Sequence, residues 1–156
     1  MAAPDVILRP GFALNCADQP METWADPACG SVRWQALFSA DQTPTDSLTC
    51  GVAHVAAGDT FTLHSHPQAE VYFCLSGRGI VMVEDIAFAL SPGVALFIPG
   101  GAVHGILHAD EAMSWFYAFA ADRFEQISYS FQTGQPVALQ MPPFGLDPSG
   151  EQEFTI

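Results

Sequence analysis

Two histidines, a glutamate and a tyrosine lie close together near the middle of the 156-residue chain. His64 and His66 are two positions apart, so they share one face of a β-strand, because successive side chains alternate between faces. Glu70 follows four residues later, and a turn at Pro67 would return its carboxylate to the same place. Imidazole nitrogens and carboxylates are ligands of divalent transition metals. The stretch therefore predicts part of a metal site.

A fourth candidate ligand, His104, comes forty residues after His64 and follows the turn sequence Pro99-Gly100-Gly101. This turn can bring the strand of His104 beside the strand of the first two histidines. Three imidazoles and one carboxylate would then hold one divalent transition metal with an open coordination position, which a catalytic metal needs. The ligand types do not choose between Fe, Mn, Ni, Zn and Co.

Nine short apolar stretches with turn residues between them follow residue 30, at intervals typical of a β-sandwich or barrel. They are 32–38, 48–55, 61–66, 70–75, 80–83, 87–90, 94–98, 103–108 and 113–119. The 13 glycines and 12 prolines favour tight turns over long helices. The fold class expected is all-β, a single-domain antiparallel β-barrel or jelly roll. Short helical turns are expected toward the termini, at 21–24 and 122–127.

The chain divides into three regions by composition. Residues 31–133 contain the strand signals and are expected to form the barrel. Residues 1–30 are interrupted by prolines and glycines, and we expect an N-terminal extension that packs on the barrel or on a dimer partner, with a candidate strand at 6–8. Residues 134–156 contain four prolines and are expected to be an extended tail.

The charge of the protein excludes several classes of partner. The formal net charge is −13, and the four basic residues are all arginine, so binding to nucleic acid or to an anionic membrane is not expected. No signal sequence or apolar run of about 18 residues is present, which predicts a cytoplasmic protein. The four cysteines are widely spaced and are expected to be free thiols.

Two motifs in the middle of the chain resemble the two conserved motifs of the cupin superfamily. The first is Gly58-x5-His64-x-His66-x3-Glu70-x6-Gly77, and the second is Gly93-x5-Pro99-x-Gly101-x2-His104. They are 15 residues apart, as in small single-domain cupins, and the asparagine that ends the second motif in the family is replaced by His108. The match covers 58–108, about a third of the chain. The resemblance implies that His64, His66, Glu70 and His104 bind one metal inside a small antiparallel barrel.

Tyr72 and Cys74 follow Glu70 at even intervals, so both are expected to point into the barrel. Tyr72 is either a core aromatic residue or, beside a dication that lowers the pKa of its phenol, a general acid or base. Cys74 is expected to be a small buried side chain.

Three further polar residues and four aromatic residues complete the set of candidates. His108 shares a face with His104 by strand parity, which predicts a role behind the ligands or in the pocket. His54 is expected to be a structural strand residue, and Arg78 an exposed turn residue. A largely apolar cavity is expected around the metal. Its candidate lining residues are Phe97, Trp115, Tyr117 and Phe119; the parity of the last three remains open.

The set of His64, His66, Glu70, Tyr72 and His104 resembles that of the small cupin dimethylsulfoniopropionate lyases. In that family a tyrosine two residues after the glutamate serves as the base. The resemblance implies that the metal binds the substrate carboxylate and acidifies the neighbouring C–H. Tyr72 then removes this proton as dimethyl sulfide leaves.

Other functions remain open at the level of sequence. An Fe(II)-dependent dioxygenase and a non-catalytic cupin that binds a metal or small ligand are the alternatives, and the scarcity of Arg and Lys argues against a phosphorylated-sugar isomerase. The expected partner is a small, carboxylate-bearing organic molecule. A binding-only cupin would bind such a ligand without turnover. The resemblance also implies a homodimer, because similar cupins are frequently dimers.

Overall fold

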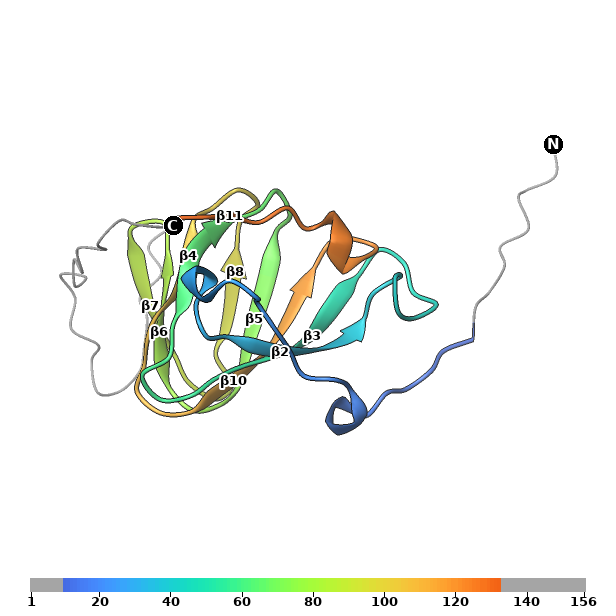
Figure 1. Ribbon diagram of the computed structural model, residues 1–156, viewed down its shortest axis with the longest axis horizontal. Coiled ribbons are helices and arrows are strands. Elements are labelled where there is room, and N and C mark those ends of the chain that lie inside the picture. The colour runs from blue at the N-terminus through green and yellow to red at the C-terminus, as the bar shows by residue number, and fades with distance from the viewer. Residues whose placement is uncertain (1–9, 133–156) are drawn as a thin grey trace.

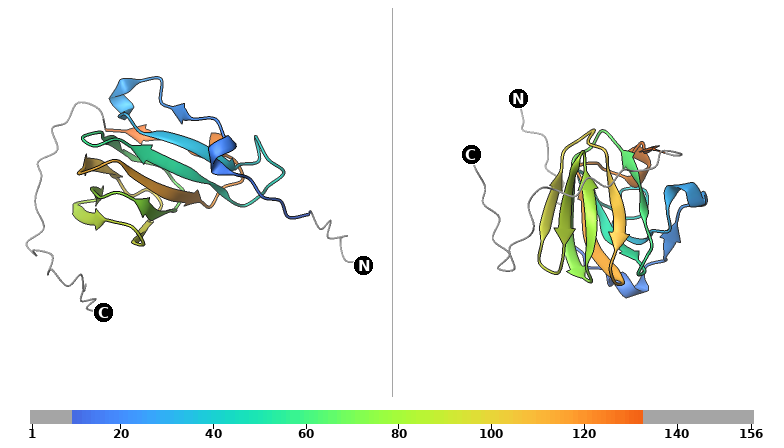
Figure 2. Two further views of the ribbon diagram at one scale, coloured as in Figure 1. Left: turned by 90° about the horizontal axis from the view of Figure 1, so that it is seen from below. Right: turned by 90° about the vertical axis from the view of Figure 1, so that its left-hand side faces the viewer.

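The computed structural model describes residues 10–132, which form two antiparallel sheets packed face to face as a jelly roll (Figures 1 and 2). The first sheet has the order β1-β2-β3-β10-β5-β8. Its strands are β1 (Glu22–Thr23), β2 (Arg33–Phe38), β3 (Thr49–Val55), β10 (Met113–Phe119), β5 (Glu70–Ser76) and β8 (Ala95–Ile98). The all-β fold class expected from the sequence is confirmed.

The second sheet has the order β11-β4-β9-β6-β7. Its strands are β11 (Ser130–Phe131), β4 (Phe61–Ser65), β9 (His104–Ala109), β6 (Gly79–Val83) and β7 (Ile86–Leu90). Three 3-10 turns, η1 (Cys16–Asp18), η2 (Pro27–Cys29) and η3 (Phe124–Gln126), complete the described elements. Within residues 10–132, no helix is long and apolar enough to cross a membrane.

All nine strands predicted from the sequence are present, with ends that shift by one residue at most. The helical turn expected at 122–127 is present as η3. The helical turn expected at 21–24 is wrong, because Glu22 and Thr23 pair with β2 as the strand β1. Neither β1 nor β11 was predicted, since two residues show no periodicity. The candidate strand at 6–8 and the tail at 134–156 lie outside the described residues.

The core lies between the two sheets and follows the alternation of the strands. Trp115, Tyr117 and Phe119 all point inward from β10 and are at most 4% exposed. Phe97 was expected to point inward as well, and this is wrong: its side chain is 65% exposed. Leu96 and Ile98 occupy the inward positions of β8 instead. Because both faces of β8 are apolar, hydrophobicity alone did not reveal which face is buried.

A glycine makes room for one of these aromatic rings. Gly51 on β3 lies opposite Tyr117 on β10, and a Cβ atom at Gly51 would lie 2.5 Å from the Tyr117 hydroxyl oxygen. It would also overlap the carbonyl oxygen of Gln35 on β2. The Tyr117 ring therefore packs over bare backbone, and this close approach requires glycine at position 51.

The N-terminal segment is attached to the first sheet by polar contacts. The Gln35 side chain donates hydrogen bonds to the carbonyl oxygens of Cys16, at 2.8 Å, and Gln19, at 3.1 Å. Further along, Gly30 bridges to Phe61 at the start of β4. These contacts attach the segment before β2 to strands of both sheets. All four cysteines are free, as expected from the sequence.

Candidate metal centre

The three candidate histidines meet at one point between the sheets. His64 on β4 and His104 on β9 are directly opposite each other in the antiparallel register, and His66 follows immediately after β4. One ring nitrogen from each histidine lies within 4.8 Å of the other two. All three residues are buried, with exposures of 0%, 0% and 3% for His64, His104 and His66.

The turn before β9 fixes this arrangement. Gly101 has a φ of 81°, in the left-handed region that favours glycine, and its N–H donates a hydrogen bond of 2.8 Å to the carbonyl oxygen of His66. Gly100 packs so closely on the Pro67 carbonyl group that a Cβ atom there would overlap it. The turn is therefore attached to the end of β4, and this attachment places His104 beside the other two ligands.

In each of the three histidine rings, the hydrogen bond made by Nδ1 determines which nitrogen can bind a metal. The Nδ1 atoms of His64, His66 and His104 lie 2.7, 2.9 and 2.9 Å from the backbone carbonyl oxygens of Thr62, Gln68 and Ala102. A carbonyl oxygen only accepts hydrogen bonds, so each Nδ1 carries the proton and donates it. In the neutral rings Nε2 is left with a lone pair, which is the form that binds a metal.

Glu70, the first residue of β5, brings a carboxylate to the same point. Its Oε2 atom lies 3.2 Å from His66 Nε2 and 3.1 Å from His104 Nε2, while His64 Nε2 is buried without a partner. Lone pairs that face a carboxylate at this distance repel it unless a cation or proton lies between them. Three imidazole nitrogens and one carboxylate oxygen therefore fit a divalent transition metal.

Burial keeps at least one ring in the neutral state. Removal from water, followed by the influence of His104, lowers the pKa of His64 to about 2. The hydrogen bond to Thr62 acts in the opposite direction but is outweighed. At neutral pH the ring is uncharged, so a cation would not have to displace a proton from it.

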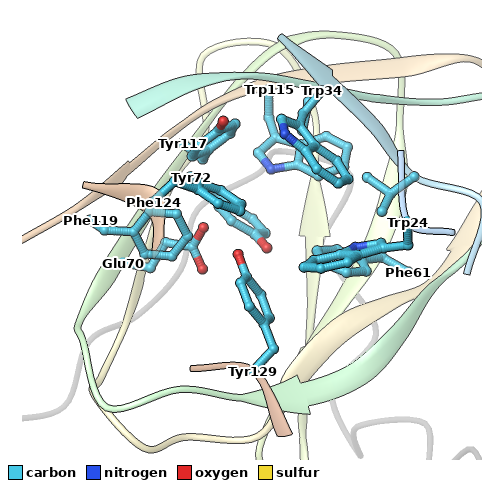
Figure 3. A pocket seen from close by; sticks show the side chains of 12 residues that line it. Trp24, Trp34, Phe61, Glu70, Tyr72, Trp115, Tyr117, Phe119, Phe124 and Tyr129 are labelled. Carbon is cyan, nitrogen blue, oxygen red and sulfur yellow. The ribbon is translucent and has the colours of Figure 1, made fainter. Parts of the chain in front are cut away.

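A cavity of about 30 Å³ lies beside the cluster and is lined mainly by aromatic rings (Figure 3). Glu70 is the one charged residue that lines it. The other lining residues are Trp24, Val32, Trp34, Ala53, Phe61, Tyr72, Trp115, Tyr117, Phe119, Phe124 and Tyr129. The expected apolar cavity is thus present, and it includes the three aromatic residues of β10.

Tyr72 points into this cavity from the same strand as Glu70. It is 1% exposed, its ring centroid lies 6.3 Å from that of His104, and Figure 3 shows its hydroxyl group directed toward the centre of the cavity. Burial, with Glu70 and Tyr129 nearby, holds the pKa of the phenol well above its usual value. Without a neighbouring positive charge, Tyr72 is therefore protonated.

A second tyrosine of the cavity, Tyr129, was missed in the sequence. Its ring centroid lies 5.3 Å from that of His64 and 5.3 Å from that of His66, and its hydroxyl group points toward Tyr72 and Glu70 (Figure 3). Burial, and then Glu70, raise its pKa well above the usual value. Tyr129 lies between η3 and β11, outside every predicted strand. The only signal was an isolated aromatic pair with Phe131.

The remaining candidates lie outside the cavity. The pocket role expected for His108 is wrong: its side chain is 60% exposed and lies 2.9 Å from Asp110. An extra residue in β9 shifts the register opposite Ile80, so the parity between His104 and His108 is broken. His54 is hydrogen-bonded to Gln35 at 3.1 Å, and Cys74 is buried, both as expected. The side chain of Arg78 is 73% exposed, which confirms an exposed turn residue.

Comparison with known proteins supports the same fold and family. The model of the cupin domain family matches residues 51–119. Dimethylsulfoniopropionate lyase DddW of Ruegeria pomeroyi is 33% identical over 128 residues, which are 82% of this chain and 84% of that protein.

Two solved structures are similar in fold over most of the chain. A cupin-2 domain from Rhodospirillum rubrum is 26% identical, with a TM-score of 0.64 over 81% of this chain and 84% of that one. The polyketide cyclase RemF from Streptomyces resistomycificus has a TM-score of 0.68 at 16% identity, over 81% and 88% of the two chains. By its fold and by its similarity to DddW over most of both sequences, the chain belongs to the cupin family.

Proposed function

We propose that the protein is a metal-dependent lyase that cleaves a small zwitterion of the dimethylsulfoniopropionate type by β-elimination. The observation that carries this proposal is the position of Tyr72, whose buried hydroxyl group faces the same cavity as Glu70 of the histidine cluster. The similarity to DddW, whose name states this activity, supports the choice of substrate.

His64, His66, Glu70 and His104 would hold the metal. A divalent cation at this point supplies positive charge, which polarises a bound carboxylate and lowers the pKa of a neighbouring phenol. The three imidazoles contribute a rigid frame, because each is held by a backbone carbonyl group. The aromatic walls exclude water from the reacting groups.

Tyr72 acts as the base in this proposal. With its pKa lowered by the cation, the phenol has first lost its proton to water. The Oη atom of this phenolate takes the proton from the carbon next to the substrate carboxylate, and the electron pair of that C–H bond forms the new carbon–carbon double bond. The carbon–sulfur bond breaks, and its electron pair leaves with sulfur as dimethyl sulfide. The second product is acrylate, so the atoms and charges balance once Tyr72 returns its proton to water.

The experiment that tests the function is the release of dimethyl sulfide. Metal-loaded protein is expected to produce dimethyl sulfide and acrylate in equal amounts from dimethylsulfoniopropionate, measured by gas chromatography and liquid chromatography. The same protein stripped of metal with a chelator is the control, and it should be inactive until metal is restored. If no dimethyl sulfide forms with any of the five metals, while Fe(II)-loaded protein consumes oxygen with small acids, a dioxygenase replaces the lyase.

We also propose that the protein is a homodimer that associates through the outer face of β5 and β8. Val71, Phe73 and Leu75 point outward from β5 and are 38%, 41% and 46% exposed, and Phe97 lies beside Val71 on β8. Neither strand carries a charged residue on this face, although the net charge of the chain is −13. A second copy offers the same apolar, uncharged surface, so the two copies can approach here without bringing like charges together.

If the dimer forms through this face, substitutions on it should lower the mass of the particle in solution from that of a dimer to that of a monomer. The double variant Phe73→Ser/Phe97→Ser is expected to be a monomer by sedimentation equilibrium, at concentrations where the unchanged protein is a dimer. Ile86→Ser is the matched control, since Ile86 is 56% exposed on β7 of the other sheet. A monomeric unchanged protein, or a double variant that remains dimeric, would contradict the proposed interface.

A further inference from the structure

Four of the rings that line the cavity form a closed circuit, which we call the aromatic box: Trp24, Trp34, Phe124 and Tyr129 (Figure 3). Ring centroids are 5.1 Å apart for Trp24 and Trp34, and 5.9 Å apart for Trp34 and Phe124. The circuit closes with 6.1 Å between Phe124 and Tyr129 and 4.9 Å between Tyr129 and Trp24. Each ring therefore lies beside the next one, and the four rings line the same cavity as Tyr72.

The box is built from segments outside the part of the chain that matches the cupin family. That match covers residues 51–119, which include the three histidines, Glu70 and Tyr72. Trp24 follows β1, Trp34 lies on β2, and the other two rings belong to η3 and the segment after it. The part of the chain that matches the cupin family thus supplies the metal cluster, whereas segments before and after it supply the box.

The electrostatics of the cavity favour a cationic group. Neither lysine nor arginine lines it, and its one charged residue, Glu70, belongs to the metal cluster, so the attraction for a cation has to come from the rings. The faces of aromatic rings attract cations through their quadrupoles, and Trp is the strongest of them. A sulfonium or quaternary ammonium group offers no hydrogen-bond donor, so ring faces are the surface that recognises it.

We propose that the aromatic box binds the onium group of the substrate and selects it over a neutral group of the same shape. This inference rests on the proposed function, because it concerns the head group of the same substrate. One wall is held in place, since the Trp34 indole N–H donates a hydrogen bond of 2.8 Å to Glu22. Trp24, Phe124 and Tyr129 are only partly buried and form the side that opens.

The cavity is too small to hold an onium group unless the rings that line it move. A volume of about 30 Å³ holds about two water molecules, so an onium group has to displace some of the rings that cover it. Because Trp24 and Trp34 belong to the box, ligand binding is expected to change the intrinsic tryptophan fluorescence. This signal measures binding without any turnover.

Two ligands of matched shape test the selectivity. 3-(Trimethylammonio)propanoate and 4,4-dimethylpentanoate have the same carboxylate and the same branched head, and they differ in the positive charge. We expect metal-loaded protein to bind the ammonium compound at least tenfold more tightly, by calorimetry and by fluorescence titration. Tenfold corresponds to about 1.4 kcal/mol. Equal affinities would show that the box is packing only and would overturn the proposal.

Variants that lack a single ring test whether the aromatic box causes the preference for the ammonium ligand. Trp24→Leu and Phe124→Leu keep an apolar side chain without a ring, and each is expected to reduce the preference below threefold while the neutral ligand binds as before. Phe12→Leu is the control, because Phe12 packs on Phe38 and does not line the cavity. A tenfold preference that survives both removals would assign the selectivity elsewhere.

Failure of this inference is distinguishable from failure of the proposed function. If the protein releases dimethyl sulfide but shows no preference for the ammonium ligand, the role of the aromatic box is wrong and the lyase function stands. If the preference depends on Trp24 and Phe124 but the protein releases no dimethyl sulfide, the lyase function is wrong and the role of the aromatic box stands.

Discussion

Replacement of His104 by alanine is expected to lower the affinity for the divalent metal at least about 100-fold, because even the residues that only orient a ligand contribute about 10–100-fold. The change removes one of the nitrogens that meet at Glu70 and leaves the carboxylate without this partner. Metal content after dialysis, measured by elemental analysis, checks the result. Dimethyl sulfide release should fall in parallel.

His108→Ala is the matched control for this prediction. His108 lies on the same strand, but its side chain is 60% exposed and contacts Asp110 rather than the cluster. Its removal should leave the metal content unchanged. Because His104 is fully buried, His104→Asn provides a smaller change of volume, and circular dichroism verifies the fold of both variants. A folded His104 variant that retains a full equivalent of metal would disprove the site.

Tyr72→Phe is expected to reduce the rate of dimethyl sulfide release by about 10²–10⁴-fold, the usual contribution of a general base. The variant loses only the hydroxyl group, and the ring still fills its buried position against Trp115. Metal content and thermal stability should therefore match those of the unchanged protein. The rate is measured with saturating substrate, so that a change in binding does not enter.

The variant Tyr129→Phe tests which of the two tyrosines of the cavity is the base. Both hydroxyl groups point into it, but only Tyr72 lies on the strand that supplies Glu70 (Figure 3). We expect a smaller loss of rate for Tyr129→Phe than for Tyr72→Phe. If Tyr72→Phe keeps full activity and Tyr129→Phe loses it, the role of base moves to Tyr129.

Local rules were enough to find the candidate ligands and the strands that carry them. The alternation of side chains places His64 and His66 together, and a proline-glycine turn precedes the strand of His104. The same alternation predicts that Tyr72 points inward, as the structure shows. These features depend on residues that are close in sequence, and their period of two is a property of any β-strand.

Two of the wrong predictions concern the direction of a side chain, and they arose where alternation breaks or where both faces are apolar. His108 was misplaced because an extra residue in β9 reverses the parity after Ile106. Phe97 was misplaced because its strand is apolar on both sides, and only the packing of the second sheet decides which side is buried. Neither a bulge nor the position of another sheet is written in a short stretch of sequence.

The sequence by itself determined the all-β fold, the candidate metal ligands and the inward direction of Tyr72, because strand periodicity and turn chemistry are local. Only the tertiary structure brought Trp24 and Tyr129 together over the cavity. These rings lie more than a hundred residues apart in the chain, and they meet because β1 pairs with β2 and β11 pairs with β4. Contacts between residues this far apart in sequence depend on the assembly of the two sheets, so no local sequence pattern predicts them.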